Sequence, residues 1–251
     1  MPRQSRIDTT GGLHHIIARG IERRKIFEDD QDREDDQDRY DFLKNLGLIL
    51  EQTETTCFAW SLMSNHFHLL LRTGAVPIAA VMRRLLSGHA IRYNRRHHRH
   101  GHLFQRYKSI LCQEDCYLLE LVGYIHLNPL RAKLVAGMDQ LDQYPFSGHG
   151  VIIGKHEQPW QNIEKVLLHF GKRDDSARCK YREFVTAGID DGRRDDLTGG
   201  GLIRSAGGWS AVRELKRSKL PIRVTSASWG RVILSLKSYP NPRNASGDVM
   251  H

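Results

Sequence analysis

The sequence is poor in cysteine and has no long apolar run. None of its four cysteines belongs to a CxxC pair, which argues against a structural zinc site or a disulfide framework. No apolar stretch approaches the roughly 20 residues that cross a bilayer, and the first ten residues, MPRQSRIDTT, contain no apolar signal segment. We therefore expect reduced thiols and a cytoplasmic protein with no membrane partner.

Acidic residues are also in deficit. Lys and Arg number 38 against 29 Asp and Glu, which gives a formal net charge of +9 and a pI near 9.5. This excess favours a polyanionic partner, with nucleic acid as the first candidate. Hydrophobic residues make up 39% of the 251 positions, enough for one core of moderate size and a smaller appendage.

Apolar periodicity predicts an α+β fold. Its elements follow the order strand, helix, strand, strand, helix, strand, helix, which is typical of an antiparallel sheet with helices on one face and the other face free for a ligand. The last of these helices should end at Pro129, since the residue before a proline disfavours helical backbone. We expect these elements at residues 13–20, 40–50, 57–62, 65–72, 77–96, 103–111 and 117–128.

Composition divides the chain into four parts. The predicted sheet and helices lie in a domain of residues 1–136, and a loop-like stretch that includes YPFSGHG follows as a linker over residues 137–157. Residues 158–218 carry short helical patterns and should form a small, mostly helical region. Residues 219–251 are expected to be an irregular tail.

Two histidines stand one residue apart in the strand pattern NHFHLLLR. In a strand, residues i and i+2 project from the same face, so His66 and His68 point together while Phe67, Leu69 and Leu71 point toward the core. Two imidazoles on one strand face can share a divalent ion, because histidine is the commonest metal ligand. The spacing alone equally fits two half-exposed histidines that bond to their neighbours.

A second pattern, YIHLN, presents a tyrosine. Tyr124 and Asn128 are spaced i and i+4, so on a helix they lie on one side. Alone, such a tyrosine fits an ordinary core residue with its hydroxyl at the surface. Beside a metal ion and basic elements, its oxygen could attack a phosphodiester whose charge the metal stabilises.

At these motifs the sequence resembles the IS200-like tyrosine transposases of the HUH superfamily, and most of all their REP-associated branch. The resemblance is dense over residues 13–135, in HHIIARGIERRKIF, CFAWSLMSNHFHLLLRTG, GHLFQRYKSIL and YIHLNPLRAKLV. NHFHLLL together with YIHLNPLRA is far more specific than either motif alone. The looser continuation runs through YPFSGH to GGLIRSAGGW.

The resemblance implies a ferredoxin-like or RRM-like HUH catalytic domain with His66 and His68 as metal ligands. It implies Tyr124 as the nucleophile, Asn128 as a polar third ligand, and Mg²⁺ or Mn²⁺ as the cofactor. The implied substrate is single-stranded DNA, often with a hairpin, which such enzymes cleave and rejoin through a 5′-phosphotyrosine. Members act as monomers or homodimers, and a cytoplasmic, nucleoid-associated location follows.

Basic residues supply candidates for contacts with DNA phosphates, which would make affinity fall with salt. They follow the first strand, lie along and at the end of the long helix, and recur in the last strand. The candidates are Arg19, Arg23, Arg24, Arg83, Arg84, Arg95, Arg96, Arg106 and Lys108.

Three stretches depart from the family pattern. A duplicated hexapeptide, DDQDRE and DDQDRY, lengthens the segment before the first helix, and the tail beyond Lys216 lacks the acidic ending that the resemblance implies. One residue is also missing between Gln105 and Arg106. Within a strand, that deletion would turn every later side chain to the opposite face unless a bulge or loop absorbs it.

Two other functions remain open from the sequence. The same sheet and basic face could hold structured nucleic acid without cutting it, as a DNA-binding protein or a degenerate transposase remnant would. A metal-dependent hydrolase that uses water in place of the phenol is a further alternative, and it would form no protein-linked DNA.

Overall fold

The structure is a computed structural model that describes residues 10–28, 36–112, 114–171 and 174–190, without the side chains of residues 114–116 and 174. By contacts, the chain divides into one unit of residues 1–202 and a second of residues 203–251. No helix in the described ranges is long and apolar enough to span a bilayer.

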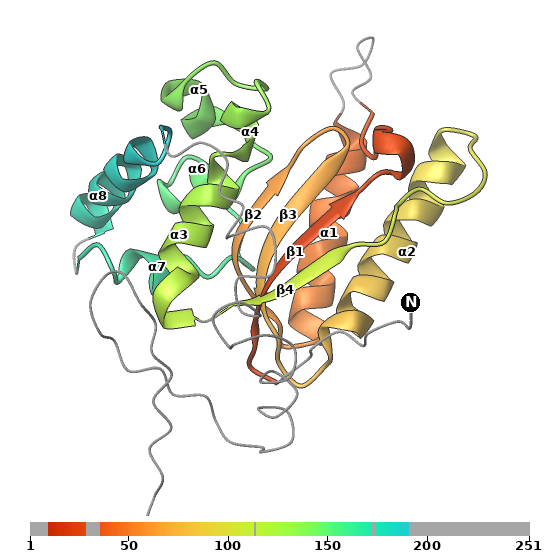
Figure 1. Ribbon diagram of the computed structural model, residues 1–251, viewed down its shortest axis with the longest axis horizontal. Coiled ribbons are helices and arrows are strands. Elements are labelled where there is room, and N and C mark those ends of the chain that lie inside the picture. The colour runs from red at the N-terminus through yellow and green to blue at the C-terminus, as the bar shows by residue number, and fades with distance from the viewer. Residues whose placement is uncertain (1–9, 29–35, 113, 172–173, 191–251) are drawn as a thin grey trace, which may run out of the picture. The chain divides into compact units, whose positions relative to one another are not determined.

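One antiparallel sheet forms the centre of the first unit. Its strands are β1 (Leu13–Arg19), β2 (Thr56–Leu62), β3 (His66–Arg72) and β4 (Lys108–Cys112). They lie in the order β2-β3-β1-β4 (Figure 1). Ile17 of β1 pairs with His68 on one side and with Lys108 on the other, while Ser61 of β2 pairs with His68. The predicted α+β class with an antiparallel sheet is confirmed.

Two long helices cover one face of this sheet, and both agree with the sequence pattern. They are α1 (Gln37–Gln52) and α2 (Ile78–Arg96), and Pro77 is the N-cap of α2. Phe42 and Leu46 of α1 and Leu85 of α2 are fully buried in the same core cluster as Phe67 and Leu69 of β3. The alternation within β3 therefore turns its aromatic and leucine side chains toward these helices.

The opposite face is also partly covered. Helix α3 (Glu114–His126) packs on β2 and β3, and its Leu121 and Ile125 share a second core cluster with Leu70 of β3. The sequence predicts helices on one face alone. The structure differs because Leu118, Leu121, Val122 and Ile125 form an apolar stripe that is buried only when α3 lies on this face.

Pro129 does not end the helical course of the chain. After α3 stops at His126, a short helix α4 (Asn128–Arg131) begins with Pro129 in its first turn. Proline is tolerated there because the first helical N–H groups have no intrahelical partner. The break between the two helices leaves Asn128 buried at the junction.

Residues 137–157, the predicted linker, include two short helices. They form α5 (Met138–Gln143) and α6 (Gly148–Ile152), and Leu141 and Ile152 are fully buried in the second core cluster. Ser147 caps α6 by accepting a hydrogen bond from the backbone N–H of His149. The apolar residues are too sparse to show a helical period in the sequence, but each is covered by a long-range partner.

Helices also occur in the next predicted region, as far as it is described. Helix α7 (Glu164–Leu167) and helix α8 (Asp174–Ala187) pack against each other, and α8 also packs against α3. Residues 191–218 of the predicted helical region and the predicted tail of residues 219–251 lie outside the described residues. The same holds for residues 29–35 of the duplicated hexapeptide.

The expected strand of residues 103–111 is interrupted. Phe104 forms an isolated bridge with Gly20, whereas the regular pairing of β4 begins with Lys108 opposite Ile17. Phe104 and Lys108 are four residues apart, whereas their partners Gly20 and Ile17 are three residues apart. The segment between Phe104 and Lys108 therefore contains one residue more than the facing part of β1. This irregularity sets the face of β4, and it places Lys108 on the same side as His68.

Candidate active site

His66 and His68 begin β3 and face the side of the sheet on which α3 packs. Their ring centroids lie 5.4 Å apart. His66 is opposite Arg19 of β1, and His68 is opposite Ile17. His68 is only 5% exposed, because it lies in the sheet interior beside α3, whereas His66 is half-buried at the strand end.

Asn65 orients the first imidazole. Its Nδ2 donates a hydrogen bond to the backbone carbonyl of Arg23 at 3.2 Å, which fixes the amide so that Oδ1 is the acceptor toward His66. The Nδ1 of His66 lies 2.6 Å from that oxygen and must therefore carry the proton. The Nε2 of His66 is then the nitrogen with a free lone pair, as a metal ligand requires.

A third histidine, which the sequence patterns did not single out, lies against the second imidazole. His15 Nε2 is 2.9 Å from His68 Nδ1, and the two rings stack with centroids 5.2 Å apart. When His68 Nδ1 donates in this bond, its Nε2 is available to a metal, as in His66. The signal was present in LHHIIAR, but only the pairing of β1 with β3 brings residues 53 positions apart together.

Both candidate ligands are neutral at physiological pH. Burial, and then the positive charge of Arg19, lower the pKa of His66 to about 4. Burial also holds the pKa of His68 well below its usual value, with further contributions from His15, His66 and Arg19. Neutral imidazole is the form that coordinates a metal ion.

Tyr124 comes to the same place from the opposite layer. Its ring centroid is 6.2 Å from that of His68 and 6.1 Å from that of His15, with edge-to-face geometry in both pairs. The tyrosine is near the end of α3, and the contact of that helix with β2 and β3 sets its distance from the imidazoles. Two motifs separated by more than 50 residues in the sequence thus meet at one site.

Asn128 lies one turn further and caps α3. Its Nδ2 donates to the carbonyls of Tyr124 and Ile125, both at 3.2 Å, and within the described residues no hydrogen bond joins this amide to His66 or His68. Because the amide nitrogen is used in capping, Oδ1 is the atom left to meet a cation. The structure thus joins Asn128 to the backbone of the nucleophile candidate.

This donor set fits a divalent ion. Two neutral imidazole nitrogens and one amide oxygen would give three protein ligands, and an ion with open positions could also accept a phosphate oxygen. The described residues contain no group of three or more His, Cys, Asp or Glu suited to hold a metal. Any site here therefore depends on Asn128 or on a substrate oxygen to complete the set.

Two of the predicted DNA contacts lie close to this site. Arg19 is opposite His66, and Lys108 shares the face of His68 because both pair with Ile17. Arg106 and Lys108 are exposed, as is Arg23 after the end of β1. The exposed Arg24 pairs with Glu22 at 2.9 Å, an interaction that solvent weakens and that a phosphate could replace.

The arginines of α2 lie on the far side of the sheet, because α2 covers the face opposite His66 and His68. Arg84 donates to Gln52, and Arg83 and Arg95 are exposed. A nucleic acid that reached these arginines would have to pass around the edge of the sheet. They are thus separated from Tyr124 by the sheet itself.

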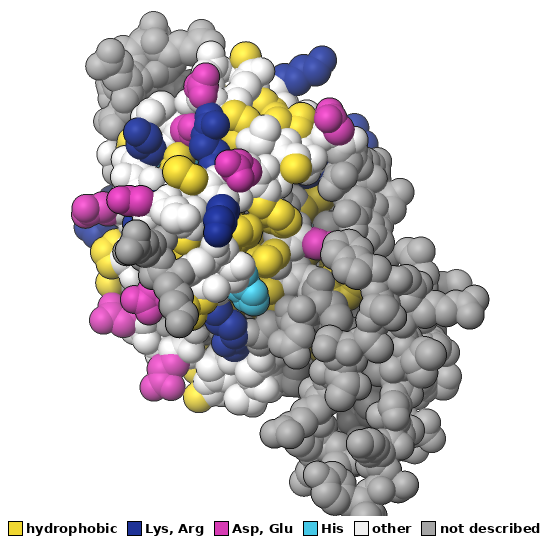
Figure 2. Space-filling model, turned by 90° about the vertical axis from the view of Figure 1, so that its left-hand side faces the viewer, with side chains coloured by type: hydrophobic (Ala, Val, Ile, Leu, Met, Phe, Trp, Pro, Cys, Tyr) yellow, Lys and Arg dark blue, Asp and Glu magenta, His cyan; other side chains and the backbone are white. Residues whose placement is uncertain are grey.

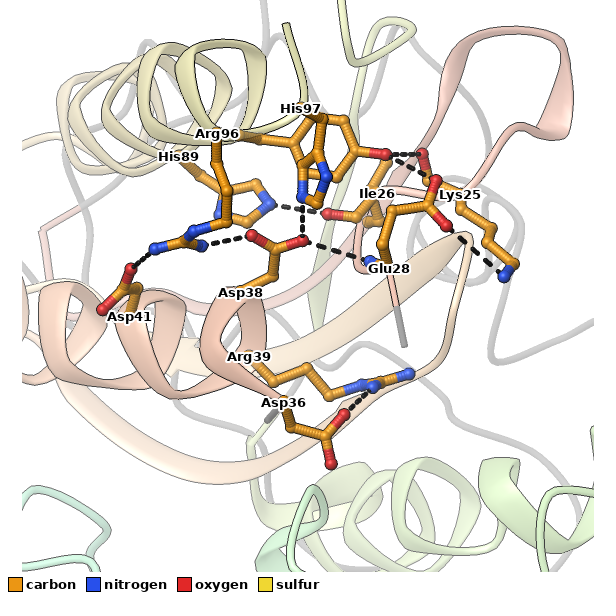
Figure 3. Close-up of polar contacts among 11 residues, drawn as sticks. Lys25, Ile26, Glu28, Asp36, Asp38, Arg39, Asp41, His89, Arg96 and His97 are labelled. Atoms are coloured by element: carbon orange, nitrogen blue, oxygen red, sulfur yellow. Dashed lines mark hydrogen bonds and ion pairs between the residues drawn. The ribbon is translucent and has the colours of Figure 1, made fainter. Parts of the chain in front are cut away.

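Arg96 has an internal role. Its guanidinium bridges Asp38 and Asp41 of α1, and His97 bonds to the other oxygen of Asp38 at 2.7 Å (Figure 3). Asp38 is 3% exposed, so the Arg96 guanidinium compensates a buried carboxylate, and His97 adds a hydrogen bond to it. These contacts link α1 with the end of α2, and a phosphate at Arg96 would have to compete with both carboxylates.

The surface that carries the C-terminal helices has mixed charge. On the side seen in Figure 2, basic and acidic side chains alternate, and apolar side chains show between them. Arg182 of α8, for example, bonds to both Asp139 and Asp142. This described face lacks the single-sign character that a phosphate track requires.

Part of the chain is similar to known proteins. Residues 9–128 match the family described as Transposase IS200 like. Among solved structures, a REP-associated tyrosine transposase bound to a REP hairpin is 13% identical, covering 64% of this chain and 98% of its own, with a TM-score of 0.48. A candidate transposase from Deinococcus radiodurans R1 is 22% identical, covering 50% of this chain and 94% of its own, with a TM-score of 0.32. Among curated proteins, none matches the chain.

The matched segment contains the whole sheet, the helices α1, α2 and α3, and the site between them. His66, His68 and Tyr124 all lie within it, and Asn128 is its last residue. Residues 9–128, just under half of the chain, thus form a segment of the IS200-like transposase type.

Proposed function

We propose that the protein is a metal-dependent tyrosine transposase that cleaves and rejoins single-stranded, hairpin-containing DNA. The observation that carries this proposal is the approach of the Tyr124 ring to within 6.2 Å of the His68 ring, on the sheet face that also presents His66. A phenol beside two neutral imidazoles supplies a nucleophile and metal ligands in one place. The net charge of +9 suits a nucleic-acid substrate.

In this reaction the Tyr124 oxygen attacks a DNA phosphorus. A bond forms between the phenol oxygen and phosphorus, the bond from phosphorus to the 3′ oxygen breaks, and the phenol proton passes through solvent to the departing 3′-hydroxyl. The product is a 5′-phosphotyrosine and a free 3′-hydroxyl, and the reverse step joins strands without a nucleotide cofactor. A divalent ion such as Mg²⁺ or Mn²⁺ would polarise the phosphoryl oxygen.

Each residue of the site has a separate task. His66 and His68 would hold the ion through Nε2, with the Oδ1 of Asn128 as a third donor. Arg19 and Lys108, on the same face, would bind phosphates on either side of the cleaved bond. The half-buried position of Tyr124 limits its ring to few orientations, so that its oxygen is presented to the strand.

A labelling experiment tests the proposal. The purified protein is mixed with end-labelled single-stranded hairpin oligonucleotides and Mn²⁺ or Mg²⁺, and the products are separated on a denaturing gel. We expect a metal-dependent, protein-linked DNA band, and mass spectrometry of its peptides should place the nucleotide on Tyr124. Cleavage without a linked band would indicate a water-using hydrolase, and binding without cleavage a non-catalytic DNA-binding protein.

The hydrogen bond from His66 to Asn65 gives a further prediction. Asn65→Ala should weaken Mn²⁺ binding by about 10–100-fold, because the imidazole loses the acceptor that fixes its tautomer and orientation. Calorimetric titration of the protein with Mn²⁺ in the absence of DNA measures this change. Ser64→Ala alters the neighbouring position of the same turn and should bind like the wild type. Equal Mn²⁺ affinity for all three proteins would contradict the role of Asn65.

A further inference from the structure

A chain of buried polar groups joins the end of α3 to the C-terminal helices. The hydroxyl of Tyr181, in α8, lies 2.6 Å from the Nδ1 of His126, the last residue of α3, and 3.1 Å from the Nδ1 of His149 in α6. The Nε2 of His149 lies 2.9 Å from a carboxylate oxygen of Asp142 in α5. Tyr181 and both imidazoles are fully buried, so solvent does not reach these contacts.

The carboxylate at one end fixes the direction of each hydrogen bond in this chain. Asp142 also accepts from the Nε of Arg182 at 2.8 Å, and a carboxylate can only accept, so the Nε2 of His149 carries a proton. Burial lowers the pKa of His149, which leaves its Nδ1 as the acceptor of the Tyr181 hydroxyl at neutral pH. The Tyr181 oxygen then accepts from the Nδ1–H of His126. Loss of this one hydroxyl would therefore separate the two imidazoles.

Helix α8 contacts α3 on both sides of Tyr124 in the sequence. On one side is the bond from His126 to the Tyr181 hydroxyl. On the other side, a Cβ added to Gly123 would lie 3.1 Å from the ring of Phe184, so the glycine allows the two helices to approach closely. The backbone of Tyr124 thus lies between two positions that α8 holds.

A third connection runs through α4. The guanidinium carbon of Arg131 is 4.9 Å from the centroid of the Tyr124 ring, and its Nη1 donates to the carbonyl of Tyr124 at 3.2 Å. Its Nη2 donates to the carbonyl of Gly188, just beyond α8, also at 3.2 Å. The part of α3 that carries Tyr124 is thus joined to α8 directly and through this arginine.

These contacts matter because side chains alone hold α3 on the sheet. The oxygen of Tyr124 has to lie in line with the bond that breaks, and a displacement of about 1 Å can lower such a rate on the order of 100-fold. Without the Tyr181 hydroxyl, His126 and His149 would each lose a buried hydrogen-bond partner. The last turn of α3 would then be free to shift, and Tyr124 with it.

We propose that Tyr181 is a positioning residue, whose hydroxyl ties His126 to His149 and thereby sets the position of Tyr124 before DNA binds. This inference rests on the proposed function of Tyr124 as the nucleophile. It gives α8, which lies beyond residues 9–128, a task in the reaction of that segment.

Single-turnover cleavage of a hairpin oligonucleotide tests this role. Tyr181→Phe keeps the ring in the core and removes only the hydroxyl. We expect its rate at saturating DNA to fall about tenfold, with unchanged dissociation constants for the hairpin and for Mn²⁺, because no metal ligand or phosphate contact is altered. A variant that cleaves at the wild-type rate, or that loses hairpin affinity instead of rate, would overturn the role of Tyr181.

Two substitutions of His149 examine the same bond from its other end. His149→Leu removes the acceptor of the Tyr181 hydroxyl and should lower the rate as Tyr181→Phe does. His149→Asn offers an amide oxygen near the place of Nδ1 and should recover much of the rate. As a control, Arg178→Met breaks the bond from α8 to the carbonyl of Ile152 without altering a contact with α3, and it should cleave like the wild type.

Amide hydrogen exchange, followed by NMR, is independent of cleavage. The N–H of Leu127 bonds to the carbonyl of Gly123 at 3.0 Å and reports the last turn of α3. In Tyr181→Phe we expect it to exchange about tenfold faster, and the amides of β1 and β3 to change much less. No change in α3, or an equal change in the strands, would overturn the role of Tyr181 whatever the activity. Faster exchange confined to α3, in a protein that forms no linked DNA, would support the tie and reject the proposed function instead.

Discussion

The Tyr124→Phe variant is expected to lose strand cleavage by at least about a thousandfold, and to form no protein-linked DNA. Phenylalanine keeps the ring and its contacts with His15, His68 and Arg131, but it removes the oxygen that would bond to phosphorus. Hairpin affinity should stay near the wild-type value, because phosphate contacts come from other residues. Rates of labelled oligonucleotide cleavage and a separate binding titration measure the two effects.

The matched control is Tyr117→Phe. Tyr117 lies two turns earlier on α3 and packs against the same core cluster, so its substitution removes an equivalent hydroxyl from the same helix. We expect this variant to cleave like the wild type. A linked band that persisted in Tyr124→Phe would show that Tyr124 is not the nucleophile. A band that disappeared equally in Tyr117→Phe would contradict a specific role of the Tyr124 hydroxyl.

Acidification from pH 7 to pH 5 is expected to lower the free energy of unfolding by about 2 kcal/mol through His89 alone. Burial between α2 and the sheet lowers the pKa of this imidazole from 6.5 to about 4. Between these values the unfolded chain binds a proton that the folded protein does not. Stability is therefore complete above pH 6.5 and falls as the pH is lowered toward 4.

Denaturant titrations at several pH values measure this dependence, with His89→Met as the comparison. The imidazole Nε2 donates to the carbonyl of Ile26 at 2.7 Å, so the variant should be less stable at pH 7. Its loss of stability between pH 7 and pH 5 should nevertheless be smaller by about 2 kcal/mol. Parallel curves for the two proteins would contradict the assignment to His89.

The sequence predicted the features that depend on the local periodicity of apolar residues. The alternation of NHFHLLLR placed Phe67 and Leu69 in the core and both imidazoles on the other face, and the structure agrees. The apolar spacing of α1 and α2 was equally clear. The family resemblance then connected Tyr124 with His66 and His68, which no spacing between such distant motifs could have done.

What the sequence could not predict depends on long-range pairing. His15 meets His68 only through the register of β1 and β3, and Arg131 meets Tyr124 only because a short helix follows the break after α3. The second sheet face is covered because α3 buries its apolar stripe there. The bond between Arg96 and Asp38 joins residues 58 positions apart, which no local pattern predicts.

The three imidazoles lie on β1 and β3, so they belong to a more rigid part of the structure than Tyr124 does. These two strands occupy the middle of the sheet, and each is hydrogen-bonded to a neighbour on both edges. Amide protons of such strands exchange most slowly with solvent, since they open only with the whole domain. Tyr124 instead belongs to a helix whose position depends on side-chain packing. When DNA binds, we therefore expect Tyr124 to move and the three imidazoles to keep their positions on the sheet.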